Sequence, residues 1–174
     1  VGSLTTSYCD QWHYGDNAVI FGDAAHAIVP FFGQGMNASF QDCVVLNRLI
    51  NKYEGNWSKI FNTFSSQHVK NGHAIANMAL ENYVEMRDSV NNPLYLKTRE
   101  LELSLEKKFP NKFIPRYSMV SFHQISYDEV YKRGKFQFKL MSEFLSATTQ
   151  ISDGPAIILS VPTFPNTNCF AFAT

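Results

Sequence analysis

The sequence predicts a mostly helical chain with a few short strands, taken from a larger α/β fold. Two long stretches, at about residues 36–53 and 57–88, carry apolar residues at helical spacing. A short apolar run at 18–21 has the length and β-branched content of a buried strand, and Gly22-Asp23 follows it directly. Ligands of open α/β sheets bind at the carboxyl ends of such strands. Too few strands are present for a complete doubly wound sheet.

The amino-terminal elements are expected to be short strands followed by one long helix. Residues 3–8 suit a short strand, and the polar, turn-rich residues 10–17 separate it from the run at 18–21. The helix over 36–53 ends at the turn 54–56. Its apolar positions are expected to form one buried stripe, made of Met36, Phe40, Cys43, Val44, Leu46, Leu49 and Ile50.

The rest of the chain is expected to be helical up to about residue 146. Gly72 lies inside the second helical stretch, where it could break or kink the helix. Asn92-Pro93 is typical of a helix start, with an N-cap residue before a first-turn proline, and this helix runs to about Lys108. Residues 110–115 are expected to be loop. Ser126-Tyr127-Asp128-Glu129 is a capping box that opens the last long helix.

Composition excludes some classes of function and leaves others open. The chain has 174 residues, with 15 basic and 15 acidic side chains and a net charge of zero, so no basic surplus is available to neutralise the phosphates of a nucleic acid. Three cysteines lie far apart and five histidines form no i, i+4 pair, which predicts no metal site and a reducing compartment. The aromatic content of 14% suits either a large core or a pocket for an aromatic ring.

Residues 22–37 are the most informative stretch for function. Gly22 and the two alanines after Asp23 leave room for backbone to approach a bulky ligand, and the Asp23 carboxylate can accept hydrogen bonds from ligand hydroxyls. Residues 33–37 form a glycine-containing turn that enters a helix, which offers free amides to an anion. The alternatives to ligand binding are purely structural: Asp23 would be a helix N-cap, and residues 33–37 would be an ordinary glycine turn.

Three strings in register resemble one known family. Gly22-Asp23, Pro30 and Gly35-Met36-Asn37 resemble the second flavin-contacting motif of the single-component, FAD-dependent aromatic hydroxylases. The similarity continues through 82–87 and 113–120, and it covers roughly residues 1–145.

The resemblance implies an α/β FAD-binding parent of which this chain is the carboxyl-terminal part. Val1 is not a methionine, and the G-x-G-x-x-G loop that binds pyrophosphate is absent. We therefore expect the end of the FAD-binding domain at 1–55, a helical carboxyl-terminal region at 56–146 and a loose tail at 147–174, with the amino-terminal half of the enzyme as a partner.

The resemblance also implies a set of site residues. The cofactor-binding set is Asp23, Pro30, Gly35, Met36 and Asn37, and the substrate-binding set is Phe31, Asn82 and Tyr117. Asp23 would accept from the ribityl hydroxyls, and the amides of 35–37 would face the pyrimidine edge of the flavin. Asn82 and Tyr117 would hold a substrate carboxylate. Without the resemblance, they would be a solvated helix residue and a half-buried aromatic residue. No side chain is expected to act as an acid or base, and His26 is expected to be structural.

The activity implied is hydroxylation of L-kynurenine to 3-hydroxykynurenine by an FAD-dependent monooxygenase that uses NADPH and dioxygen, in the pathway to NAD. The alternatives are a flavin hydroxylase acting on a phenol or benzoate, and an inactive truncated flavin-binding fragment. Eukaryotic relatives are held on the outer mitochondrial membrane by a carboxyl-terminal span, and a member without one would be cytoplasmic. The apolar stretch Ala156–Val161 is too short for the roughly 20 residues that a span needs.

Overall fold

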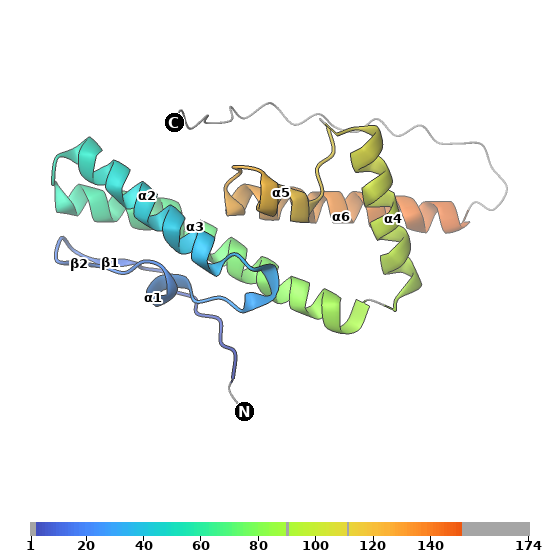
Figure 1. Cartoon of the computed structure of the whole chain (residues 1–174), viewed down its shortest axis with the longest axis horizontal. Coiled ribbons are helices and arrows are strands. Elements are labelled where there is room, and N and C mark those ends of the chain that lie inside the picture. The colour runs from blue at the N-terminus through green and yellow to red at the C-terminus, as the bar shows by residue number, and fades with distance from the viewer. Residues whose placement is uncertain (1–2, 90, 111, 151–174) are drawn as a thin grey trace. The chain divides into compact units, whose positions relative to one another are not determined.

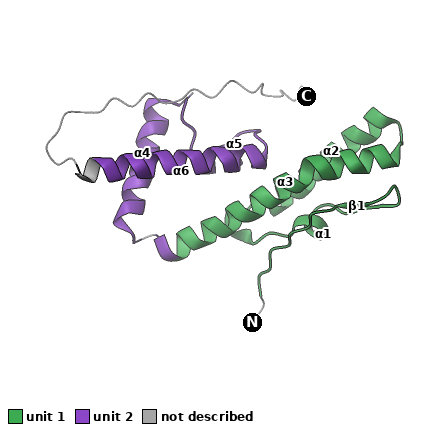
Figure 2. Ribbon diagram, turned by 180° about the vertical axis from the view of Figure 1, so that it is seen from behind, with its two compact units in different colours: residues 1–87 green, residues 88–174 purple. Residues whose placement is uncertain are grey.

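The chain forms two compact units, residues 1–87 and residues 88–174 (Figures 1 and 2). The computed structural model describes residues 3–89, 91–110 and 112–150, with the side chains of 148–150 left out. The boundary predicted at residue 55 separates two sequence patterns, whereas the compact units divide at 87/88. The predicted tail beyond 150 and Ala156–Val161 lie outside the described residues.

The first unit is a helical hairpin with a small ribbon and a short helix beside it. Helices α2 (Gly35–Tyr53) and α3 (Trp57–Val84) run side by side, and α1 (Asp23–His26) and the ribbon lie along them (Figure 1). A 3₁₀ turn, η1 (Pro30–Phe32), precedes α2 and packs on α3. The core between these elements consists of Trp12, Ala25, Leu49, Ile60, Phe61 and Phe64.

The strand predictions were largely wrong. Residues 3–8 form no strand, and the run at 18–21 contributes only β2 (Ala18–Val19), which pairs antiparallel with β1 (His13–Tyr14). Ile20 and Phe21 are 37% and 41% exposed rather than buried. A strand is buried on both faces only when it has neighbouring strands and covering helices, and β1 is the one neighbour in the described part of the chain.

The predicted bounds of α2 are confirmed, and its predicted stripe is confirmed at the carboxyl-terminal end, where Leu49 is buried and Leu46 and Ile50 pack on the core, but it is wrong at the amino-terminal end. Met36, Phe40 and Val44 are 68%, 62% and 43% exposed. The buried positions are Ala38 and Asp42, which lie on a neighbouring stripe of the same helix, and Leu49, which belongs to the predicted stripe. Both stripes have helical spacing. A prediction from hydrophobicity alone does not choose the stripe that contains the Asp42 carboxylate as a buried one.

Helix α3 continues through Gly72 without a break, so the predicted kink is wrong. A Cβ at this position would lie 2.7 Å from Cζ2 of Trp12 and 3.2 Å from Cβ of His26. Glycine is therefore required here by close packing and not by backbone conformation. The helix passes into a single π-helical turn, η2 (Glu85–Ser89), at its end.

The second unit consists of α4 (Pro93–Lys108), α5 (Arg116–Phe122) and α6 (Tyr127–Gln150), with α4 and α5 packed on α6. The predicted helix starts are confirmed. Oδ1 of Asn92 accepts from the amides of Leu94 and Tyr95, and Oγ of Ser126 accepts from the amide of Glu129 at 3.4 Å. Helix α5 was missed, since a seven-residue helix after Pro115 has too few turns for a periodic signal.

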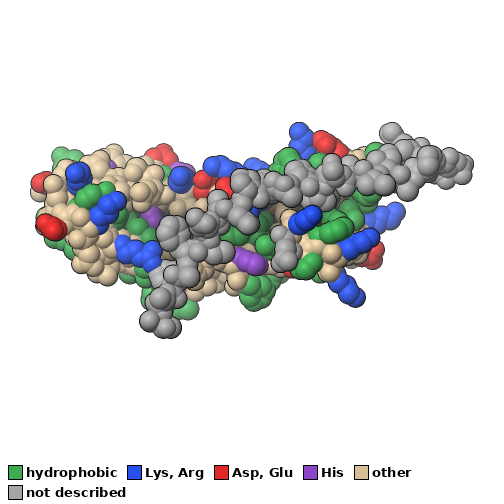
Figure 3. Space-filling view, turned by 90° about the horizontal axis from the view of Figure 1, so that it is seen from above, with side chains coloured by type: hydrophobic (Ala, Val, Ile, Leu, Met, Phe, Trp, Pro, Cys, Tyr) green, Lys and Arg blue, Asp and Glu red, His purple; other side chains and the backbone are tan. Residues whose placement is uncertain are grey.

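Charged side chains are spread over the surface. Lys and Arg lie at several separate places on the face in Figure 3, with Asp and Glu between them. None of the described helices is both long and apolar enough to cross a membrane. Within residues 3–89, 91–110 and 112–150, no group of three or more His, Cys, Asp or Glu side chains is arranged to hold a metal ion.

Candidate flavin site

The Gly22-Asp23 turn presents a carboxylate to solvent. Gly22 has φ 60° and ψ −145°, a conformation that favours glycine. Asp23 is the first residue of α1, while the N-cap is Gly22 and no side chain caps the helix. The alternative role of Asp23 as an N-cap is therefore excluded. Its carboxylate is exposed and does not cap its own helix.

The start of α2 is an open set of backbone donors. The N-cap residue, Gln34, makes no side-chain bond to the helix amides, and the first intrahelical bond runs from the Ala38 amide to the Gln34 carbonyl. The amides of residues 35–37 have no intrahelical acceptor, and the helix dipole adds partial positive charge there. Met36 is 68% exposed and Asn37 is also exposed, so this helix start faces solvent.

The sequence 33–38 also fits the looser dinucleotide fingerprint G-x-G-x-x-A. That fingerprint requires a strand before the glycine turn. Here a 3₁₀ turn precedes it, and Gly33 closes that turn at φ 68° with its amide bonded to the Pro30 carbonyl. The loop is therefore no pyrophosphate loop of the usual strand-turn-helix kind.

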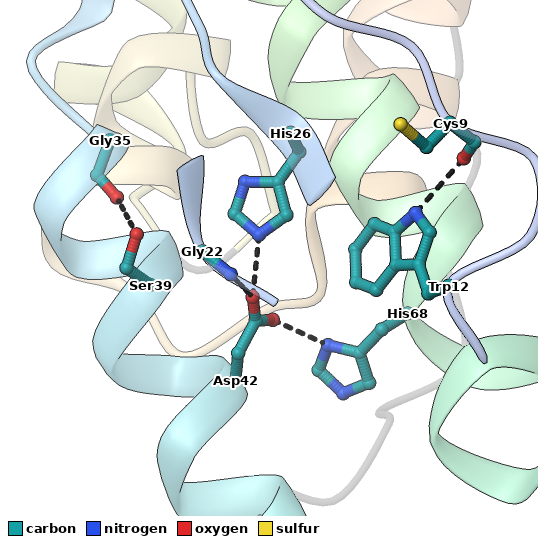
Figure 4. A network of polar contacts seen from close by, with 8 residues as sticks. All are labelled: Cys9, Trp12, Gly22, His26, Gly35, Ser39, Asp42 and His68. Carbon is teal, nitrogen blue, oxygen red and sulfur yellow. Dashed lines mark hydrogen bonds and ion pairs between the residues drawn. The ribbon is translucent and has the colours of Figure 1, made fainter. Parts of the chain in front are cut away.

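The two segments lie against each other. A Cβ on Gly22 would lie 3.3 Å from Oγ of Ser39, one turn into α2, and Oγ of Ser39 donates to the Gly35 carbonyl at 3.0 Å. Figure 4 shows Gly22 beside the first turns of α2. The Asp23 turn and the open helix start thus form one continuous surface.

A buried carboxylate ties this surface to the core. Oδ2 of Asp42 accepts from the Gly22 amide at 2.9 Å and lies 2.5 Å from Nε2 of His26, and Oδ1 lies 3.1 Å from Nδ1 of His68 (Figure 4). The exposed fractions of Asp42, His26 and His68 are 2%, 2% and 6%. We name these three side chains the Asp42 cluster. An ionised carboxylate only accepts hydrogen bonds, so Nε2 of His26 and Nδ1 of His68 carry the protons.

Hydrogen bonds decide the charge of Asp42. Burial raises the pKa of this carboxyl, but the hydrogen bonds from His26, His68 and the Gly22 amide together lower it by more than burial raises it. The resulting pKa is about 2. Asp42 is therefore ionised at neutral pH inside the core.

The Asp42 cluster should make the protein sensitive to acid. Because the pKa of Asp42 falls from 3.8 to about 2 on folding, its contribution is complete above 3.8 and is lost as the pH falls through 2. We expect this residue to account for about 2 kcal/mol of the unfolding free energy. Urea unfolding at several pH values, compared with Asp42→Asn, measures it. A variant that keeps the wild-type slope between pH 4 and 2 would contradict the assignment.

The η1 turn is held in place from α3. Nδ2 of Asn82 donates to the Phe31 carbonyl at 2.6 Å, and the rings of Phe31 and Tyr83 lie 4.5 Å apart. The guanidinium of Arg87 lies 5.3 Å from the centroid of the Tyr83 ring. Pro30 is exposed, Phe31 is half-buried and Phe32 is buried. The turn therefore presents a proline and one aromatic ring on a backbone fixed by a side-chain amide.

Comparison with known proteins agrees with this geometry. Residues 3–79 match the FAD binding domain family. The chain is 43% identical over 152 residues to a kynurenine 3-monooxygenase of Myxococcus xanthus, covering 87% of this chain and 32% of the relative. It is 38% identical over 157 residues to that of Sus scrofa, covering 90% of this chain and 33% of the relative. The chain belongs to the FAD-dependent aromatic hydroxylases.

This member spans about a third of the length of the curated relatives it matches. A second bacterial relative, the kynurenine 3-monooxygenase of Stenotrophomonas maltophilia, is 44% identical over 148 residues, covering 85% of this chain and 32% of the relative. The chain is thus a part-length region of the α/β aromatic-hydroxylase fold, and its few strands are consistent with that.

The two residues predicted to bind a carboxylate lie in different compact units. Asn82 belongs to the first unit and is already bonded to the Phe31 carbonyl. Tyr117 belongs to the second, where it is 49% exposed and its ring centroid lies 6.4 Å from that of Phe122. Their joint role stays a prediction.

Sequence reasoning missed Asp42 and His68 in this hydroxylase, while the structural role expected for His26 agrees with its bond to Asp42. A signal was present, because Ala38, Asp42, Val45 and Leu49 have helical spacing. An acidic residue on such a stripe indicates a buried, paired carboxylate. Oε1 of Gln34, inside the same glycine-containing turn, accepts from Nδ2 of Asn37 at 3.0 Å.

Proposed function

We propose that the protein carrying this chain is an FAD-dependent monooxygenase that hydroxylates L-kynurenine to 3-hydroxykynurenine with NADPH and dioxygen. The observation that carries the proposal is the exposed Asp23 carboxylate on a glycine turn packed beside the open amino terminus of α2. The match of residues 3–79 to an FAD binding domain and the names of the relatives support the cofactor and the substrate.

The donor and acceptor groups on this surface fit a flavin. A ribityl chain carries hydroxyls that can donate hydrogen bonds to an exposed carboxylate at Asp23. The pyrimidine edge of a reduced flavin is negatively charged, and the free amides of residues 35–37 with the helix dipole favour an anion. The surface thus offers an acceptor for the ribityl hydroxyls and donors for the anionic edge of the ring.

The flavin, when bound, supplies the oxygen-transfer chemistry. This chain's residues position and shield the reactants. Pro30 and Phe31 provide the wall against which the substrate ring would lie, and Asn82 holds that wall through the Phe31 carbonyl. An asparagine amide has two N–H donors, and Nδ2 of Asn82 also lies 3.9 Å from Sδ of Met86, a weak acceptor that a carboxylate would replace. Tyr117 carries a phenol O–H, the other kind of donor proposed for a substrate carboxylate.

Asp23→Ala tests the cofactor assignment in a full-length enzyme carrying this chain. Loss of one or two hydrogen bonds should weaken FAD binding by about 1–3 kcal/mol, or about 5- to 150-fold. The measurement is the ratio of flavin to protein absorbance after purification, followed by FAD titration. Asp16→Ala, which removes another exposed aspartate, is the matched control. FAD retained at the wild-type ratio would remove Asp23 from the site.

Asn82→Ala and Tyr117→Phe test the substrate assignment. Each should raise the KM for kynurenine by roughly 5- to 150-fold while FAD stays bound, because one carboxylate contact is lost. Asn82→Ala should also lower kcat, since the Phe31 carbonyl loses its donor. Asn62→Ala, on the exposed side of α3, serves as the control. Unchanged KM and kcat in both variants would exclude the two residues.

A further inference from the structure

The Gly22 turn is held by a hydrogen bond to Asp42, 20 residues further along the chain. Its amide donates to Oδ2 of Asp42, which projects from the buried face of α2. The amide of Ala25 and that of His26 bond back to the Gly22 carbonyl, so the same residue also begins α1. Gly22 is therefore held at both its amide and its carbonyl, and Asp23 is the next residue.

The other two members of the Asp42 cluster hold the carboxylate itself. The His26 ring also belongs to α1 and lies 5.1 Å from the Trp12 ring, and the His68 ring stacks on Phe64 at 5.0 Å. Nδ1 of His26 is buried and has no hydrogen-bond partner among the described residues. Within the part of the chain that the structure describes, the hydrogen bond to Asp42 is therefore the one that orients this ring.

We propose that Asp42 is a positioning residue for the cofactor, which sets the direction of the Asp23 carboxylate through the Gly22 amide and the His26 ring. The inference rests on the proposed function, because it takes Asp23 to be the flavin contact. Asp42 itself is 2% exposed, so it would act on the cofactor only through the residues that it bonds. It acts on two residues of the turn at once, whereas His68 touches only the far oxygen of the carboxylate.

The difference between Asp42 and His68 provides the test. Asp42→Ala removes the acceptor of the Gly22 amide, while His68→Phe keeps a ring against Phe64 and leaves the Gly22 bond in place. Both variants damage the same buried cluster. A merely structural role predicts similar effects of the two on FAD, and a positioning role predicts that only Asp42→Ala weakens FAD binding.

Two measurements are made on the full-length enzyme carrying this chain. The first is amide hydrogen exchange at Gly22 in the FAD-free protein, which should become at least about tenfold faster in Asp42→Ala and stay within about threefold in His68→Phe. The second is the Kd for FAD, which should rise at least about tenfold in Asp42→Ala relative to His68→Phe. Asp42→Asn keeps an oxygen for the Gly22 amide and should restore most of the affinity.

The outcomes separate this inference from the proposed function. Unchanged Gly22 exchange in Asp42→Ala overturns the inference, as does an equal Kd for FAD in Asp42→Ala and His68→Phe. If Asp23→Ala still weakens FAD in that case, the proposed cofactor contact stands alone. If Asp42→Ala does not fold, Asp42→Leu combined with His68→Phe replaces it, because no His68 nitrogen is then left unpaired. His68→Phe alone remains the reference.

Discussion

The 174-residue chain alone is expected to form no detectable 3-hydroxykynurenine when it is given FAD, NADPH, dioxygen and L-kynurenine, and to bind FAD poorly. The groups proposed here as cofactor contacts, Asp23 and the amides of residues 35–37, would serve only the ribityl and ring side of the cofactor. The adenosine and pyrophosphate side requires a glycine-rich loop between a strand and a helix, and the sequence contains no G-x-G-x-x-G. Part of the binding surface for the cofactor is therefore absent from this chain.

The exposed stripe of α2 indicates that the isolated chain also tends to associate. Met36, Phe40 and Val44 form an apolar row on the solvent side of that helix, and Ile20 and Phe21 are also exposed. Exposed apolar patches promote association. The experiment expresses residues 1–174, measures product by chromatography and FAD binding by titration, and uses the Myxococcus xanthus relative as the positive control. If the chain formed product at a rate comparable with that relative, the expectation would be wrong, and so would the inference that part of the cofactor-binding surface is absent from this chain.

Gly72→Val is expected to destabilise the first unit by about 3 kcal/mol or more, because no space exists for a side chain at this point of α3. The first added carbon would meet Cζ2 of Trp12 at 2.7 Å, and Trp12 is only 1% exposed and packed on the core. The tryptophan cannot move without disturbing His26, whose ring lies 5.1 Å away. The cost therefore reaches the Asp42 cluster and the Gly22 turn.

Urea unfolding followed by circular dichroism measures the loss of unfolding free energy. Lys70→Val is the matched control, since it places the same β-branched residue at an exposed position of the same helix and isolates the helix-propensity term. Gly72→Ala should have a smaller cost than Gly72→Val, because alanine improves helix propensity by about 1 kcal/mol. Equal stability of Gly72→Val and Lys70→Val would show that the contact with Trp12 relaxes freely.

Local signals were sufficient where a structure depends on neighbours in sequence. Asn92 before Pro93 and Ser126 before Glu129 predicted two helix starts correctly, because a capping bond spans only two or three residues. The bounds of α2 followed from periodicity for the same reason. The flavin motif was also recognisable from the chain alone, since its glycines, its aspartate and its proline occur at fixed spacing.

Contacts between distant residues could not be predicted in this way. The pairing of β2 with β1 instead of a buried parallel sheet depends on which other strands are present. The choice between two stripes of α2 depends on the His26 and His68 partners that make a buried carboxylate acceptable. From the sequence, Gly72 is predicted to break the helix. The structure shows that it is a glycine because Trp12 packs closely against it.

The sequence by itself therefore determined the four long helices α2, α3, α4 and α6 and the family to which the chain is similar. Only the tertiary structure revealed Asp42 as the acceptor of the Gly22 amide, and Asn82, 51 residues from Phe31, as the donor to that turn. The physical reason is that a buried hydrogen bond is worth most when water is excluded, and folding decides which side chains lose their water together.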